Sequence, residues 1–97
     1  MTKRTFIFDG SDGAAEMLSA ILNHYADIAF PLGGSECAAA SREAVHNIIE
    51  KLKPLGEIEI SRRQRPMLRS AVKWFYNDSA YASPNDPMYA GLVRRLA

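Results

Sequence analysis

Hydrophobic positions between residues 61 and 78 (SRRQRPMLRSAVKWFYND) recur at the three- and four-residue spacing of one helix face. Leu68, Ala71, Val72 and Phe75 fall on this face and are expected to be buried. Trp74, the single tryptophan of the chain, follows Ala71 by three positions and is expected to be at least partly buried beside them. The pattern predicts a helix from about 65 to 77 that forms a central part of the core.

Three further segments have the same helical periodicity. The first ends at Phe30, before Pro31; the second ends near residue 53, before Pro54; the third occupies the last ten residues. Their expected buried positions are Met17, Leu18, Ile21, Leu22, Tyr25 and Ile28; Ala44, Val45, Ile48, Ile49 and Leu52; and Met88, Tyr89, Leu92, Val93 and Leu96.

The beginnings of these helices have recognisable capping residues. Ser11 or Asp12 can cap the first helix, because a short oxygen-bearing side chain accepts from the free N–H groups of a first turn. The second helix can begin at Ser35 or at Ser41, and the sequence leaves this open. Asp86 followed by Pro87 predicts the start of the last helix, since proline has a helical φ and no N–H to satisfy.

Two short segments predict strands. Thr5–Phe8 is rich in β-forming residues and stops at the turn-forming segment 9–13, while Glu57–Ile60 alternates polar and apolar residues, with Ile58 and Ile60 facing inward. Two strands alone are marginally stable, so helices must cover one face of their sheet. The predicted fold is α+β, one small monomeric domain over residues 1–97, with helices packed on a two-stranded sheet in the order β-α-α-β-α-α.

Composition limits the class of protein. The chain has 97 residues, 47% of them hydrophobic, which suits one soluble domain. Cys37 is the only cysteine, which excludes an internal disulfide framework and favours a reducing compartment. No apolar run approaches the roughly 18 residues of a membrane span, and the N-terminal segment lacks a secretory hydrophobic region. We therefore expect a cytoplasmic protein.

The sequence has no catalytic signature. Asp9 follows a strand, as does the nucleophile of haloacid-dehalogenase-like phosphotransferases, but Ser11 stands where those enzymes carry a second aspartate. Gly33-Gly34-Ser35 lacks the lysine of a phosphate-binding loop. His24, Cys37 and His46 have no metal-ligand spacing. Cys37 is expected to be a buried or semi-buried, inert thiol, although a Cys–His pair can also form between distant positions. His24 is expected at the edge of the apolar face of the first helix, and His46 is expected to be exposed. We expect no enzyme activity, cofactor or metal.

Charge is unevenly distributed along the chain. Residues 1–60 carry nine acidic and five basic residues, whereas residues 61–97 carry seven basic and two acidic ones. The two halves can neutralise each other in the fold or leave two surfaces of opposite sign. The candidate basic surface, here called the basic row, consists of Arg62, Arg63, Arg65, Arg69 and Lys73. Such a row with aromatic neighbours can bind phosphates, and a solvated helix face is the simpler alternative.

The candidate acidic surface depends on where the second helix begins. If that helix runs unbroken from Ser35, then Glu36, Glu43 and Glu50, here called the acidic stripe, lie on one side, with about 10 Å between neighbours. A second acidic cluster at the first strand-to-helix turn contains Asp9, Asp12 and Glu16. Both sets can contact a Lys/Arg-lined partner surface, and ordinary outward-facing charges are the simpler alternative.

In overall character, a 97-residue chain with no motif, one cysteine and separated charges resembles the small inhibitors encoded by phages and mobile elements, anti-CRISPR proteins among them. Those proteins share no motif, so the resemblance assigns no role to any residue. It implies a non-enzymatic, stoichiometric binding protein. Such a protein would dock on a host protein or ribonucleoprotein complex that handles nucleic acid and would block that complex. DNA mimicry by an acidic face is one possible mode. The alternative is a small protein that binds nucleic acid through the basic row.

Overall fold

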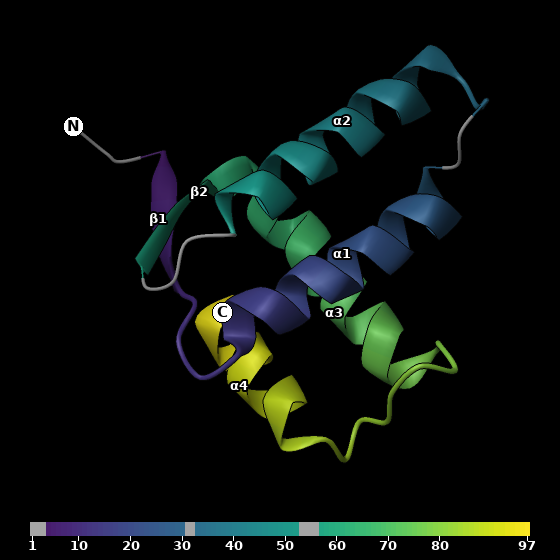
Figure 1. The fold of residues 1–97 in the computed structure, drawn as a ribbon. Helices are drawn as coiled ribbons and strands as arrows, with labels where there is room; N and C mark the ends of the chain where they lie inside the picture. The colour runs from purple at the N-terminus through teal and green to yellow at the C-terminus, as the bar shows by residue number, and fades with distance from the viewer. Residues whose placement is uncertain (1–3, 31–32, 53–56) are drawn as a thin grey trace.

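The computed structural model describes residues 4–30, 33–52 and 57–97 and has the predicted order of strands and helices (Figure 1). The breaks predicted at Pro31 and at Pro54-Leu55-Gly56 lie outside the described residues. The elements are β1 (Thr5–Asp9), α1 (Ala14–Ala29), α2 (Glu36–Lys51), β2 (Glu57–Ser61), the short 3-10 helix η1 (Arg62–Gln64), α3 (Arg65–Asn77) and α4 (Pro87–Arg95).

The two predicted strands pair with each other, and the sheet that they form is antiparallel. Phe6 pairs with Ile60 and Phe8 with Ile58, and all four side chains are buried. Ile7, between the two phenylalanines, points to the other face and is 53% exposed. The alternation of buried and exposed side chains follows from the two-residue period of a strand.

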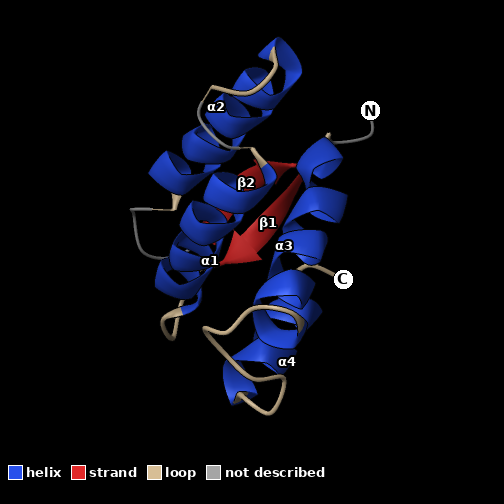
Figure 2. Ribbon diagram, turned by 90° about the vertical axis from the view of Figure 1, so that its right-hand side faces the viewer, coloured by secondary structure: helices blue, strands red, loops and turns tan. Residues whose placement is uncertain are grey.

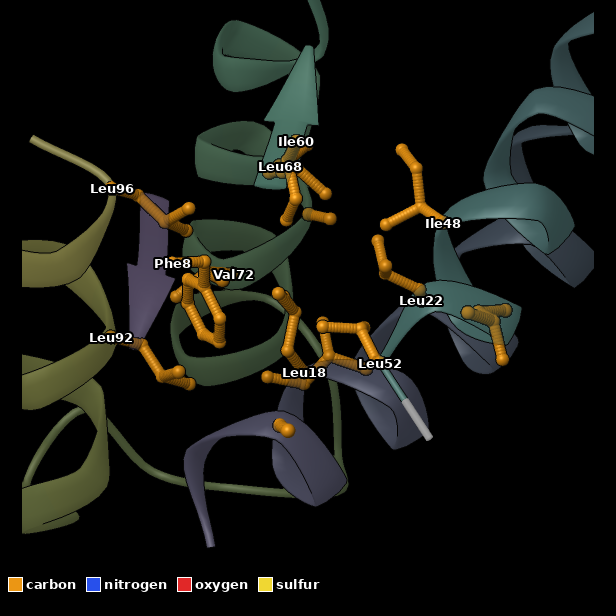
Figure 3. Packing of buried hydrophobic residues seen from close by; sticks show 14 of the residues in the cluster. Phe8, Leu18, Leu22, Ile48, Leu52, Ile60, Leu68, Val72, Leu92 and Leu96 are labelled. Atoms are coloured by element: carbon orange, nitrogen blue, oxygen red, sulfur yellow. The ribbon is translucent and has the colours of Figure 1, made fainter. Parts of the chain in front are cut away.

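The core lies between the inner face of this sheet and the four helices. In the view of Figure 2, the sheet is seen between α1 and α2 on the left and α3 and α4 on the right. Figure 3 shows Phe8 of β1, Leu18 of α1, Val72 of α3 and Leu92 of α4 directed into the same region. All four side chains are at most 1% exposed. The molecule is therefore a compact single α+β domain.

Three of the helix beginnings agree with the sequence. The Asp86 carboxylate accepts from the N–H of Met88 at 2.9 Å, so it caps α4. The Ser35 hydroxyl accepts from the N–H of Ala38 at 3.2 Å, which places the start of α2 at Ser35 and not at Ser41. Helix α3 begins at Arg65, as predicted.

The predicted cap of α1 is wrong. Neither Ser11 nor Asp12 caps this helix; its N-cap is Gly13, which makes no side-chain hydrogen bond. Asp12 and Gly13 both have positive φ, 57° and 81°, so the chain enters the helix through a left-handed turn. In this turn the carbonyl of Ser11 accepts from the N–H of Ala14 at 3.0 Å, so backbone oxygen replaces the expected side-chain cap.

Two positions expected to be buried are exposed. Ile28 is 59% exposed, because the buried face of α1 is centred on Leu18 and Leu22 and leaves Ile28 at its margin. Val93 is 39% exposed. Successive residues of an α-helix point about 100° apart around its axis, so Val93 points away from the buried face that contains Leu92. The other predicted core positions are buried or half-buried, and so is Trp74.

The α1–α2 pair is held by an arginine whose role had no sequence signal. Arg42 of α2 donates from Nη1 to the carbonyls of Ala26 and Phe30, at 3.2 and 3.1 Å, and from Nη2 to the Asp27 carboxylate at 2.8 Å. The last carbonyls of an α-helix have no partner within the helix. Arg42 therefore completes the C-terminal end of α1 from the neighbouring helix.

Replacing Arg42 by alanine is expected to lower the free energy of unfolding by about 1–3 kcal/mol, because hydrogen bonds to a charged donor are lost at a partly buried site. Arg42→Lys should recover only part of this stability, since one ammonium group cannot reach three acceptors with the geometry of a guanidinium. Urea unfolding of the three proteins measures the effect. Equal stability of Arg42→Ala and wild type would contradict the assigned role.

Candidate functional site

The acidic stripe lies on a single uninterrupted helix. Glu36, Glu43 and Glu50 are exposed on α2, which has no break near Ser41. Each seven-residue step falls only about 20° short of two full turns and rises about 10 Å, so the three carboxylates follow nearly one line along the helix. Val45, Ile48 and Ile49 are the buried residues of α2, and the acidic stripe lies on the opposite side.

The helix that carries the stripe is fixed to the rest of the domain. Its buried residues Val45, Ile48 and Ile49 belong to the core, and Arg42 ties it to the end of α1. Among the described residues, the carboxylates of Glu36 and Glu43 have no hydrogen bond or ion pair. The stripe is thus a rigid, outward-facing row of negative charge.

The second acidic cluster lies on a different surface. Asp9, Asp12 and Glu16 are exposed at the β1–α1 turn and the first turn of α1, and Asp12 lines a shallow hollow with Arg94 and Arg95 of α4. The structure does not bring this cluster onto the α2 helix that carries the stripe. These carboxylates belong to a surface of mixed charge.

Asp9 has a local structural role in that turn. Its carboxylate accepts from the N–H of Ser11 at 3.0 Å, and the Nε of Arg95 donates to the Asp9 carbonyl at 2.8 Å. Hydrogen bonds from the Ser11 hydroxyl and N–H, together with the charge of Arg95, lower the pKa of Asp9 from its ordinary value. The Asp9 carboxylate thus organises the turn that leads into α1.

Three members of the basic row contact their own chain. The Nε of Arg62 donates to the carbonyl of Thr5 at 3.2 Å, and the Arg65 guanidinium lies 4.4 Å from the centre of the Phe6 ring. The Nε of Arg69 donates to the carbonyl of Leu96 at 2.7 Å. Arg63 and Lys73 are exposed. The basic row thus joins β1, α3 and the end of α4, in addition to presenting charge to solvent.

The histidines and the cysteine are separate features. His24 is half-buried at the edge of α1, as expected, and its ring stacks on that of Tyr81, with 4.1 Å between centroids. His46 is half-buried, although it was expected to be exposed. Cys37 is exposed, so its predicted burial is wrong: it lies in the first turn of α2, before the buried residues of that helix begin.

No three His, Cys, Asp or Glu side chains in residues 4–30, 33–52 and 57–97 form a group that could hold a metal ion. Within these same ranges, every helix is too short or too polar to cross a lipid bilayer. Comparison of the chain with protein-family models, with curated proteins and with solved structures finds no match. The assignment of function therefore depends on the geometry of this chain.

A buried tyrosine combines an apolar environment with an unsatisfied hydroxyl. Tyr76 is 1% exposed, and its hydroxyl has no hydrogen-bond partner among the described residues. Burial, with a smaller contribution from the negative charge of Asp86, raises the pKa of Tyr76 to about 12. A hydroxyl buried without a partner costs stability relative to the same ring without it.

Tyr76→Phe is therefore expected to raise the free energy of unfolding by about 1 kcal/mol at neutral pH. In the wild type, the unfolded chain loses this proton near pH 10.0 while the folded chain keeps it to about 12, so stability falls as the pH rises between these values. The variant should lose less stability over that range. Denaturant unfolding at pH 7 and at pH 11 measures both effects, and a variant less stable than wild type at pH 7 would refute the interpretation.

Proposed function

We propose that this protein is a non-enzymatic binding module that docks through the acidic stripe of α2 on a Lys/Arg-lined surface of a protein partner. The observation that carries the proposal is the placement of Glu36, Glu43 and Glu50 along the outward side of one unbroken, core-anchored helix. Charges at such an interface accelerate encounter and penalise wrong geometry more than they add affinity. The free thiol of Cys37 is compatible with a cytoplasmic setting.

Proteins that bind nucleic acid have Lys/Arg-lined grooves, which is the kind of surface that the stripe would contact. Duplex DNA carries about one charge per 1.7 Å of axis, whereas the stripe carries one per about 10 Å. The stripe therefore imitates DNA only sparsely, and its charges can occupy selected positions of a phosphate-binding groove. Blocking such a groove would make the protein an inhibitor of a nucleic-acid-handling complex, in the manner of the anti-CRISPR proteins it resembles.

The arrangement of the basic row favours this proposal over direct nucleic-acid binding. Arg62 and Arg69 donate to backbone carbonyls of their own chain, and Arg65 lies over Phe6. Each of the two bonds uses one of the five N–H donors of a guanidinium, so these arginines have a role within the fold that needs no phosphate. Among the described residues, the Glu36 and Glu43 carboxylates have no such role within the fold.

Affinity capture from a host lysate, with and without nuclease treatment, tests the proposal. A partner that is retained after nuclease treatment is expected, because the contact is between proteins. Duplex DNA added to the purified complex should displace this protein from the partner. Retention that depends on intact nucleic acid would instead support binding through the basic row. If duplex DNA did not displace this protein from the partner, the stripe would not occupy a phosphate-binding groove.

A further inference from the structure

A groove runs between α3 and α4, away from the acidic stripe. Its volume is about 240 Å³, and it is lined by Arg69, Val72, Lys73, Val93 and Ala97. Figures 1 and 2 both show α4 and α2 on opposite sides of the molecule. The α3–α4 groove is therefore a second surface, independent of the one used in the proposed function.

The charged residues of the groove are both cations. Arg69 and Lys73 are four residues apart on α3, which places them one above the other on the helix surface. The bond from the Nε of Arg69 to the carbonyl of Leu96, at 2.7 Å, fixes that guanidinium beside the end of α4. Among the described residues, no Asp or Glu side chain lines the groove. The groove is thus complementary in charge to a carboxylate.

The rest of the groove is apolar. Val72 is almost fully buried at 1% exposure, and Val93 from α4 is 39% exposed. Val93 lies outside the buried face of α4, so its side chain contributes little to the core of the domain. A floor formed by Val72, Val93 and Ala97 favours an apolar side chain.

We propose that the α3–α4 groove binds a segment of a protein partner in which an apolar side chain stands next to a carboxylate. The apolar side chain would pack on Val72, Val93 and Ala97, and the carboxylate would lie between Arg69 and Lys73. The volume suits one or two side chains and not a whole helix, so the groove recognises a short motif. This inference does not require the acidic stripe to bind anything.

Methyl NMR of the full chain tests the inference with three probes. N-acetylleucine carries both the apolar side chain and the carboxylate, N-acetylleucinamide carries only the side chain, and inorganic phosphate carries only negative charge. N-acetylleucine should shift the methyl signals of Val72 and Val93 with saturation, and the other two probes should do so much more weakly.

Charge reversal supplies the matched comparison. Lys73→Glu should weaken N-acetylleucine binding roughly fivefold, the upper end for an exposed ion pair. Arg63→Glu, the same change at an exposed arginine outside the groove, should leave binding unchanged. The proposal would be overturned if N-acetylleucinamide or phosphate bound as tightly as N-acetylleucine. It would also be overturned if no probe shifted the valine signals. Valine shifts that depend only on protein concentration would overturn it too, because they assign the groove to a second copy of the chain.

Discussion

Replacing Phe8 by alanine is expected to lower the free energy of unfolding by about 3–5 kcal/mol. The Phe8 side chain has no exposed surface and lies where β1, α1, α3 and α4 meet (Figure 3). Truncation removes the apolar surface of a whole ring and leaves a cavity that these rigid elements can fill only partly. For a chain of this size the loss is a large fraction of a total stability of about 5–15 kcal/mol.

The neighbouring residue on the same strand is the control. Ile7 is 53% exposed on the outer face of the sheet, so Ile7→Ala is expected to cost about 1 kcal/mol or less. Urea unfolding followed by circular dichroism measures both variants, and the midpoint should move without a change in slope. Equal losses for Phe8→Ala and Ile7→Ala would mean that the sheet buries neither face preferentially, which would contradict the fold.

Much of this fold can be predicted from local patterns, because the physics that sets it acts within a few residues. Ile58 and Ile60 alternate with two glutamates, so one strand face had to be buried, and the antiparallel register places them opposite Phe8 and Phe6. The pair Asp86-Pro87 determines the start of α4 through a cap and a preset φ.

The remaining features depend on contacts between distant parts of the chain. In the sequence, Arg42 is only one of several basic residues, because no neighbouring residue indicates that its side chain completes the end of α1. Ile28 and Val93 follow the helical spacing but lie at or beyond the margin of the buried face, whose centre is set by the packing partner. The contact between the Arg65 guanidinium and the Phe6 ring also has no signal in the sequence. The groove between α3 and α4 likewise depends on how these two helices pack together, which no local pattern shows.

Reversing the charge of the acidic stripe is expected to have the largest effect on binding. With lysine at positions 36, 43 and 50, association with the captured partner should slow by about ten- to a hundredfold at low salt, since electrostatic steering contributes on that order to on-rates. The wild-type on-rate should itself fall as salt is added, because exposed charges are screened over about 10 Å at 0.1 M. Stopped-flow or surface-based kinetics at several salt concentrations measure both effects.

The fold should survive this change. All three positions are exposed, and the lysine in the first turn of α2, where positive charge opposes the helix dipole, costs only about 0.3–1 kcal/mol. A circular dichroism spectrum like that of wild type is therefore expected. A control with the same change in net charge is Glu57→Lys, Glu59→Lys and Asp78→Lys, all at exposed positions outside α2.

The central claim, that the acidic stripe is the docking surface, is tested most directly by one side-by-side titration of the purified partner. Wild type, the stripe variant (Glu36→Lys, Glu43→Lys and Glu50→Lys) and the control variant are titrated at the same ionic strength. If the claim holds, the stripe variant binds at least about tenfold more weakly, while the control variant stays close to wild type. Equal affinities for the stripe variant and wild type, or equal losses in the two variants, would contradict it.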